Sequence, residues 1–266
     1  MTDVPEQPEE PTIDRRSADI GIVCTHNAEV KAFVKQLDRV KKYVEGSSVF
    51  RGGFINEIVR IAIVEAGPGF ALHRRVTETL IEEHNPPWIL SVGFSSALTA
   101  ELQSGDVCLA DEICDTHGNS LPVKCRIPES KRIFVRKHVV ADKHPGTLDS
   151  KSKLNSSTHA VACDTTSLAV AQACNERSTD ERPIRFLSIR GIIDAYSESV
   201  TDEGLAFCFE PAVSERPKLV SGLMNKLKPN PSLKPWQDRA TDVSLNLNRF
   251  LLSTVKQIAD KLGKSF

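Results

Sequence analysis

Short apolar runs alternate with amphipathic segments along this chain, and no other feature constrains its fold as strongly. Four runs have the length and the polar borders of strands buried on both faces of a sheet. They are residues 19–24, 61–64, 88–92 and 186–190. Apolar side chains at helical spacing predict helices over 28–37, 71–84 and 165–176. This alternation predicts an α/β fold, with a central mixed, largely parallel sheet that helices cover on both faces.

The remaining segments have weaker patterns. Further short strands are expected at residues 49–50, 55–64, 105–110, 133–135 and 139–140. Residues 117–132 predict irregular surface structure, and the polar stretch 142–157 predicts a flexible loop with a short turn of helix. Five prolines within residues 201–241 predict irregular structure there, with a lid as one interpretation. The apolar face of residues 242–262 predicts a closing amphipathic helix.

The length and the charge balance limit the domain count and the partners. A chain of 266 residues fits one domain better than two, so we expect a single domain over residues 18–266. Residues 1–17 are polar and contain prolines, which predicts a disordered tail. Lys and Arg number 34 against 35 Asp and Glu. This balance lacks the basic excess of nucleic-acid-binding domains, so no nucleic-acid partner is expected.

The seven cysteines indicate a reducing compartment. None has CxxC spacing, and some, such as Cys24, lie inside apolar runs. We therefore expect buried reduced thiols rather than disulfides, and no metal site, because the histidines also lack the paired spacing of zinc ligands. The first residues contain no secretory signal, and no apolar run approaches the roughly 20 residues of a membrane span. A cytoplasmic protein without a membrane partner is predicted.

Short motifs suggest a more specific fold and function. In chain order they are Ile20-Gly-Ile-Val with Glu29-Val30, Ala66-Gly-Pro-Gly69, Val92-Gly-Phe-Ser-Ser-Ala-Leu98, Gly105-Asp-Val107, Ala162-Cys-Asp-Thr-Thr-Ser-Leu-Ala-Val-Ala171 and Arg190-Gly-Ile-Ile-Asp194. Their order and spacing resemble those of methylthioadenosine/S-adenosylhomocysteine nucleosidases, of the nucleoside phosphorylase and nucleosidase superfamily. The resemblance implies the fold of that superfamily, a nucleoside-type small-molecule ligand and no cofactor. It also implies a homo-oligomer, a dimer or larger.

Asp194 is the predicted general acid. Cleavage of an N-glycosidic bond to a purine requires protonation of the leaving base. Asp194 follows a predicted central strand, and ligands of open α/β sheets bind at the carboxyl ends of strands. The resemblance aligns it with the general acid of the family. The alternative is a helix-capping or loop carboxylate with no catalytic role.

Glu29 is the predicted second catalytic carboxylate. The resemblance aligns it with the glutamate that activates water in the nucleosidases, although the preceding residues Thr25-His-Asn-Ala28 differ from the family pattern. A solvated glutamate in the first turn of a helix, favoured by the helix dipole, is the alternative interpretation.

The remaining predicted site departs from the family. The resemblance places a methionine and a ribose-binding glutamate at Thr165 and Thr166, so a charged acceptor is replaced by a neutral hydroxyl. Phe94 replaces the serine of the glycine-rich turn. These changes favour a 5′-modified nucleoside. The residues expected to bind the ligand are Gly67, Gly93, Phe94, Ser95, Thr165 and Thr166.

Three functions remain open at this stage. Hydrolysis is favoured because the arginines that hold phosphate in phosphorylases of this fold are missing from residues 24–28 and 90–93. A non-catalytic or ligand-binding member of the superfamily is the alternative. A phosphorylase with an altered phosphate site is the third. In that case Arg51, Arg74 or Arg75 would supply the positive charge that binds phosphate.

Overall fold

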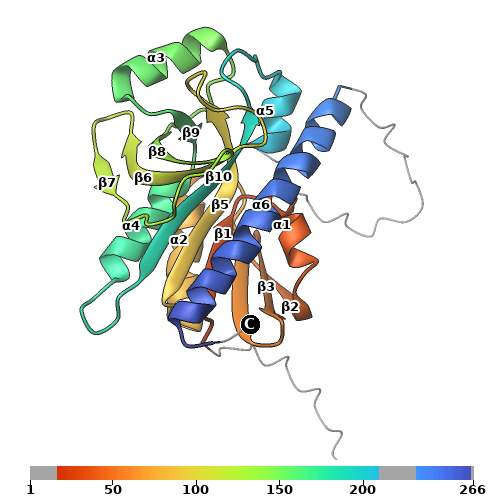
Figure 1. The fold of residues 1–266 in the computed structure, drawn as a ribbon, viewed down its shortest axis with the longest axis vertical. Coiled ribbons are helices and arrows are strands. Elements are labelled where there is room, and N and C mark those ends of the chain that lie inside the picture. The colour runs from red at the N-terminus through yellow and green to blue at the C-terminus, as the bar shows by residue number, and fades with distance from the viewer. Residues whose placement is uncertain (1–16, 210–231, 265–266) are drawn as a thin grey trace, which may run out of the picture.

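The computed structural model describes residues 17–209 and 232–264. In these ranges ten strands form one sheet in the order β10-β6-β8-β9-β5-β1-β4-β3-β2, with β7 paired to β6 (Figure 1). The strands are β1 Ile20–Cys24, β2 Asp38–Glu45, β3 Ser48–Ile55, β4 Val59–Glu65, β5 Trp88–Ala97, β6 Val107–Asp115, β7 Ser120–Pro122, β8 Ile133–Val140, β9 Ala162–Asp164 and β10 Arg185–Asp194. The helices are α1 Asn27–Val34, α2 Phe70–His84, α3 Leu148–Thr158, α4 Ser167–Arg177, α5 Asp202–Cys208 and α6 Lys234–Lys261.

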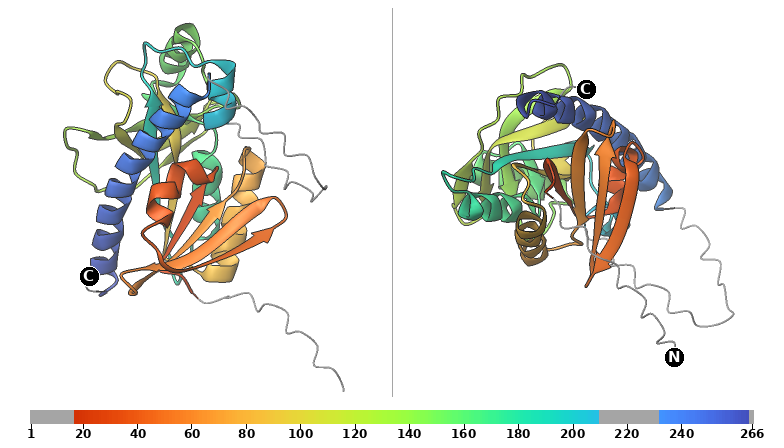
Figure 2. Two further views of the ribbon diagram at one scale, coloured as in Figure 1. Left: turned by 90° about the vertical axis from the view of Figure 1, so that its right-hand side faces the viewer. Right: turned by 90° about the horizontal axis from the view of Figure 1, so that it is seen from below.

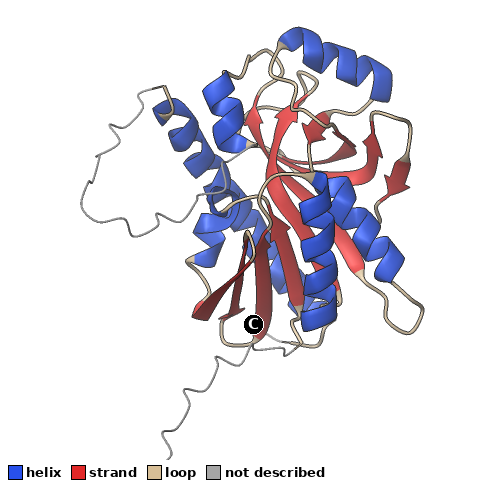
Figure 3. Cartoon of the chain, turned by 180° about the vertical axis from the view of Figure 1, so that it is seen from behind, coloured by secondary structure: helices blue, strands red, loops and turns tan. Residues whose placement is uncertain are grey.

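Helices cover both faces of the sheet, as predicted. The apolar side chains of α1 and the long helix α6 pack on one face, and those of α2 and α4 pack on the other (Figure 1, Figure 3). The central strand β5 is buried along its whole length. A single α/β domain with its core on both sides of the sheet is therefore confirmed for the described residues.

The sheet is mixed, as predicted, with five parallel and five antiparallel pairings among the described strands. The strands β1, β4, β5 and β10 pair in parallel, but β3 runs antiparallel to both β2 and β4. The physical reason is the short connections between β2, β3 and β4, because a tight turn can join only antiparallel strands. At the other end, β10 pairs with both β5 and β6, so β5, β9, β8, β6 and β10 close into a ring.

Several local predictions were wrong. The whole of β2 was missed, because this edge strand is exposed along most of its length and has no apolar alternation. Where a flexible loop with a short turn of helix was predicted over 142–157, the 11-residue helix α3 forms and extends to Thr158. The two short strands predicted at 133–140 are one strand, β8.

The prediction of irregular structure over 201–241 is also wrong in the parts of this segment that the structure describes. α5 forms near its start, and α6 begins at Lys234, with Pro235 in the first turn, where proline is tolerated. Residues 210–231 of that segment, and residues 1–16 of the predicted tail, lie outside the described residues. Figure 2 shows the long α6 running along most of the height of the domain.

The thiols agree with the sequence prediction. All seven cysteines are free, and each of them is buried except Cys125, which is half-buried. No helix in residues 17–209 or 232–264 combines the length and the apolar character that a membrane span requires.

Candidate active site

The candidate site lies where β1, β5, β9 and β10 end. α3 and α5 sit at this end of the sheet (Figure 1). In the register of β10 with β5, Ile192 faces Ser95 and Asp194 faces Ser96, so Ile193 is an extra residue of β10. Such a bulge redirects the side chain that follows it. The bulge therefore places Asp194 beside Ser96, at the position where open α/β sheets bind ligands.

Asp194 is completely buried and has two polar neighbours. The Ser96 hydroxyl donates a hydrogen bond to Oδ1, and the Lys151 ammonium lies 2.5 Å from Oδ2. Burial raises the pKa of the Asp194 carboxyl to about 6, and this rise persists although Lys151 and the Ser96 hydrogen bond act to lower it. A carboxyl with this pKa exchanges its proton near neutral pH, as a general acid must.

Lys151 was not predicted. Its side chain is fully buried, and Nζ also donates hydrogen bonds of 2.7 Å to the carbonyl oxygens of Ala195 and Glu198. The sequence did contain a signal for the helix that carries it. Thr147 and Ser150 form a capping box, with each side chain bonded to the backbone of the other, and they fix the start of α3.

Glu29 is buried beside the end of β1 and against β5. Its Oε2 accepts hydrogen bonds from the backbone N–H groups of Thr25 (2.6 Å) and His26 (3.2 Å). Its Oε1 accepts from the N–H of Phe94 at 3.1 Å. A carboxylate offers about four acceptor positions, so most of its hydrogen-bonding capacity holds the end of β1 against β5.

Gly93 lies between two charged side chains. A Cβ atom at this position would come within 2.9 Å of both Arg190 Nη1 and Glu29 Oε1. The residue predicted to bind ligand therefore has a clear structural role, because only glycine lets β5 pass between these groups.

Arg190 and Asp164 form a buried ion pair below Gly93. Arg190 Nε lies 3.0 Å from Asp164 Oδ2, and Nη2 donates to the Ser91 hydroxyl at 2.7 Å. Burial raises the pKa of Asp164, but Arg190 and the hydrogen bonds from Ser167 and Thr166 outweigh it and hold the pKa at about 2. Asp164 remains a carboxylate and fixes the start of α4.

The two predicted threonines are at the start of α4. Thr166 is buried, and its backbone N–H donates to Asp164 Oδ1 at 2.7 Å. Thr165 is half-buried. The structure thus places both at the candidate site without a carboxylate at either position.

The other predicted ligand residues divide into two groups. Phe94 is buried, with its ring centroid 5.8 Å from that of His26, and Gly67 lies half-buried in a turn with a φ of +82°. The Ser95 hydroxyl is occupied within the sheet, because it donates a hydrogen bond of 2.7 Å from β5 to the carbonyl oxygen of Cys163 on β9. Phe94 and Gly67 lie near Glu29, whereas Ser95 is used within the sheet.

An aromatic pair beside Asp194 was also missed. The rings of His144 and Phe209 are stacked with centroids 3.4 Å apart, and His144 Nδ1 lies 3.4 Å from the Ser96 hydroxyl. Burial lowers the pKa of His144 to about 3, so the ring is neutral. A neutral aromatic surface next to a carboxyl suits a flat heterocycle.

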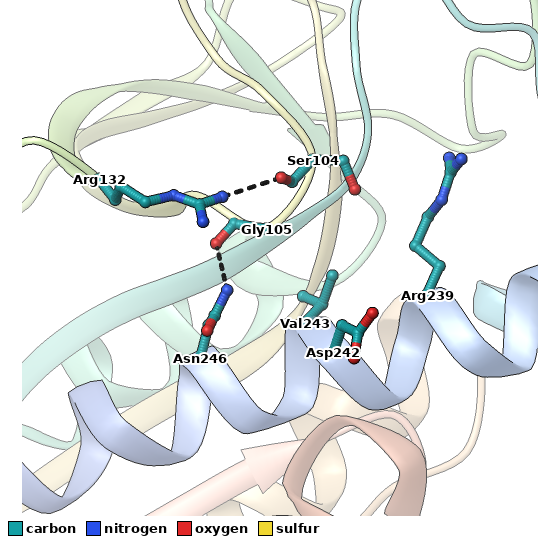
Figure 4. A pocket seen from close by; sticks show the side chains of 7 residues that line it. All are labelled: Ser104, Gly105, Arg132, Arg239, Asp242, Val243 and Asn246. Carbon is teal, nitrogen blue, oxygen red and sulfur yellow. Dashed lines mark hydrogen bonds between the residues drawn. The ribbon is translucent and has the colours of Figure 1, made fainter.

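Two hollows of the described surface lie elsewhere. One, of about 380 Å³, is lined by Ser104, Gly105, Arg132, Arg239, Asp242, Val243 and Asn246 (Figure 4). The other, of about 480 Å³, lies between β3 and α6 and includes Ile55, Leu252 and Lys256. Neither is lined by a predicted site residue.

The family of the chain follows from a comparison with family models. The model described as Phosphorylase superfamily matches residues 19–151, which is half of the chain, so the protein belongs to the phosphorylase superfamily. The matched segment contains Glu29, Gly67, Gly93, Phe94 and Ser95, and it ends before Thr165, Thr166 and Asp194. No curated protein sequence matches the chain.

Solved structures share the fold at low sequence identity. A methylthioadenosine/S-adenosylhomocysteine nucleosidase from Colwellia psychrerythraea, in complex with adenine, is 15% identical with a TM-score of 0.62, over 88% of this chain and 95% of that one. The nucleosidase of Campylobacter jejuni gives 13% and 0.64, over 92% and 100%. A futalosine hydrolase mutant of Helicobacter pylori gives 15% and 0.61, over 89% and 99%. Identities this low show the fold alone.

Proposed function

We propose that the protein is a hydrolase that cleaves the N-glycosidic bond of a nucleoside-type ligand. Asp194 acts as the general acid toward the leaving base, and Glu29 positions the attacking water. The observation that carries this proposal is the setting of Asp194: a buried carboxyl at the end of a central strand, with a pKa of about 6, beside the Ser96 hydroxyl and the His144–Phe209 pair.

The proposed chemistry follows from this geometry. As the glycosidic bond breaks, its electron pair moves onto the base, and a proton from Asp194 neutralises the base. The sugar becomes oxocarbenium-like and is attacked from the opposite face. Glu29 keeps about one free acceptor position for a water molecule after its three backbone hydrogen bonds.

Water is favoured over phosphate as the nucleophile. A phosphate dianion requires fixed positive charge. In the described part of the chain, Arg51 is paired with Glu65, and Arg74 with Glu176. Arg190 is paired with Asp164.

The ribose end of the ligand is expected to be unusual. A charged acceptor for two hydroxyls, lost at Thr166, would contribute roughly 1.5–3 kcal/mol per hydrogen bond. We therefore propose a 5′-modified nucleoside, with its substituent near Phe94. We also propose a cytoplasmic homo-oligomer, a dimer or larger.

A specific observation favours a second candidate, a non-catalytic ligand-binding protein. Asp194 is paired with Lys151, and Glu29 is largely occupied by backbone hydrogen bonds. Both carboxylates then serve mainly to organise the fold, and the stacked aromatic pair provides a surface for a base.

Release of free adenine or hypoxanthine from a panel of unmodified and 5′-modified nucleosides, with and without phosphate, separates these functions. Hydrolysis predicts release that does not depend on phosphate. Release that requires phosphate identifies a phosphorylase. No release from any nucleoside by folded protein, together with adenine binding by calorimetry, identifies the binding protein.

A further inference from the structure

Lys151 has contacts that a structural anchor does not require. Its Nζ reaches Asp194 Oδ2 at 2.5 Å and two carbonyl oxygens, of Ala195 and Glu198, at 2.7 Å each. The two carbonyl oxygens accept hydrogen bonds from Nζ, and the contact with Asp194 Oδ2 is an ion pair. Both carbonyls belong to the segment directly after Asp194, so a single buried cation holds both the candidate acid and the backbone that follows it.

That backbone segment is already held by other contacts. The Glu198 carboxylate accepts from the N–H of Ala195 at 2.8 Å, and Arg239 donates to both of its oxygens at 2.9 and 3.1 Å. A neutral side chain could complete the remaining packing. The positive charge of Lys151 therefore needs an explanation, and among the described residues its one ion pair is with Asp194.

The other groups that face Asp194 do not supply a proton. They are Ser96 from β5, Glu198 after β10, Cys163 from β9 and Cys208 from α5, with the neutral His144 behind Ser96. Burial raises the pKa of both thiols, to about 12 for Cys208, and Glu198 is bound to Arg239. Among these groups only the Lys151 ammonium has a proton that Asp194 can take up.

The resting charge state creates a difficulty for an acid that acts alone. With a pKa of about 6, Asp194 is mainly a carboxylate at pH 7, and it lies beside the Lys151 ammonium. A ring nitrogen of the base accepts hydrogen bonds, and it finds no donor on a carboxylate.

We propose that Lys151 is a positioning residue that stores the proton which Asp194 delivers to the leaving base. This inference rests on the proposed function. As the base docks, the Nζ–H bond breaks and an O–H bond forms on Asp194. That O–H bond then breaks as the N–H bond of the base forms, and the base leaves with the electron pair of the glycosidic bond. The water oxygen bonds to the anomeric carbon and gives its proton to Glu29, and the neutral Lys151 amine regains a proton through solvent.

The variant Lys151→Arg distinguishes a role of the Lys151 proton from a role of its positive charge. A guanidinium keeps the positive charge but does not give up its proton. In the unmodified protein the Lys151 ammonium supplies the proton when Asp194 is a carboxylate, so base release stays flat above about pH 6. In Lys151→Arg only protonated Asp194 acts, so release falls about tenfold per pH unit above about pH 6. Lys153→Met, at an exposed position of the same helix, is the control and keeps the flat profile.

Infrared spectroscopy tests the same assignment without any activity, and with a side chain that fits the space. At about pH 7.5 the unmodified protein should lack a protonated Asp194 carboxyl band, identified by difference from Asp194→Asn. Lys151→Met should show that band, because a buried carboxyl without a cation takes up a proton. Adenine added to the unmodified protein should also produce it, and adenine added to Lys151→Arg should not.

Each result has a definite meaning. A flat pH profile in Lys151→Arg, or a steep fall above about pH 6 in the unmodified protein, overturns proton storage while leaving hydrolysis by Asp194 in place. A protonated band in the unmodified protein without adenine, or no band in Lys151→Met, overturns it even if no nucleoside is cleaved. A catalytically silent protein with the predicted bands contradicts the proposed function and leaves the Lys151–Asp194 assignment intact.

Discussion

The two buried carboxylates of the candidate site are held in different ways. Glu29 accepts hydrogen bonds from three backbone N–H groups, and these bonds join the end of β1 to β5. Asp194 is held by two side chains, Ser96 and Lys151, which come from β5 and α3. Backbone donors cannot change their protonation, whereas a lysine can. Glu29 is therefore built into the fold, and Asp194 is the carboxylate whose charge can respond to a ligand.

The largest effect is expected from Asp194→Asn on catalysis. An amide cannot donate a carboxyl proton, so base release should fall by about 10²–10⁴-fold. Steady-state release from the best nucleoside of the panel measures it. Asp149→Asn, an exposed carboxylate on α3, is the matched control and should retain activity. Unchanged release in folded Asp194→Asn would remove Asp194 from the chemistry.

Glu29→Ala should give the largest loss of stability. It leaves the N–H groups of Thr25, His26 and Phe94 without their acceptor, at a cost of roughly 3–5 kcal/mol in unfolding free energy. Glu29→Gln keeps an acceptor oxygen and should cost less. Urea denaturation measures both, with the exposed Glu45→Ala as the control. Equal stability of Glu29→Ala and Glu45→Ala would contradict the comparison between the two carboxylates.

Stability should decrease as the pH falls below about 6.5. Burial lowers the pKa of His73 and His138 to about 4 and that of His144 to about 3, so the unfolded chain binds protons that the folded protein excludes. Asp194 acts in the opposite direction, since its folded pKa of about 6 lies above its ordinary value.

The three histidines outnumber this one carboxyl, so unfolding takes up about two protons near pH 5. The free energy of unfolding should therefore fall by roughly 2.7 kcal/mol per pH unit there. Thermal or urea unfolding across this range measures the slope, and His117→Gln, at an exposed position, should leave it unchanged. If the free energy of unfolding instead increased as the pH was lowered from 6.5 to 4, these histidines would not be buried as neutral rings.

The smallest effect is expected at Gly93. A Cβ atom 2.9 Å from both Arg190 and Glu29 must displace one of them, so Gly93→Ala should cost about 1–3 kcal/mol. Gly52→Ala is the matched control, because its nearest contact would be a carbonyl oxygen at 4.0 Å. The urea denaturation midpoints of the two variants measure this difference in stability. Equal midpoints would mean that Arg190 and Glu29 are not packed against Gly93 of β5 as described.

The α/β fold was predictable because buried strands and amphipathic helices have different periods of apolar residues. The prediction failed where that signal is weak. β2 is an exposed edge strand, and α3 is polar, with a start marked only by the capping pair Thr147 and Ser150.

The site was predictable only in part, for a similar reason. Asp194 and Glu29 stand in recognisable motifs beside strand ends. The contact between Lys151 and Asp194 depends on how α3 docks over the end of β10, across 43 residues of chain, and local sequence patterns do not encode such contacts. The same holds for the stacking of His144 on Phe209.

A crystal structure of the protein with adenine tests the central claim most directly. We predict adenine at the ends of β5 and β10, beside the His144–Phe209 pair, with a ring nitrogen within hydrogen-bond distance of the Asp194 carboxyl. Adenine in the hollow lined by Arg132 and Arg239 instead, with the Asp194 cluster unchanged, would contradict it.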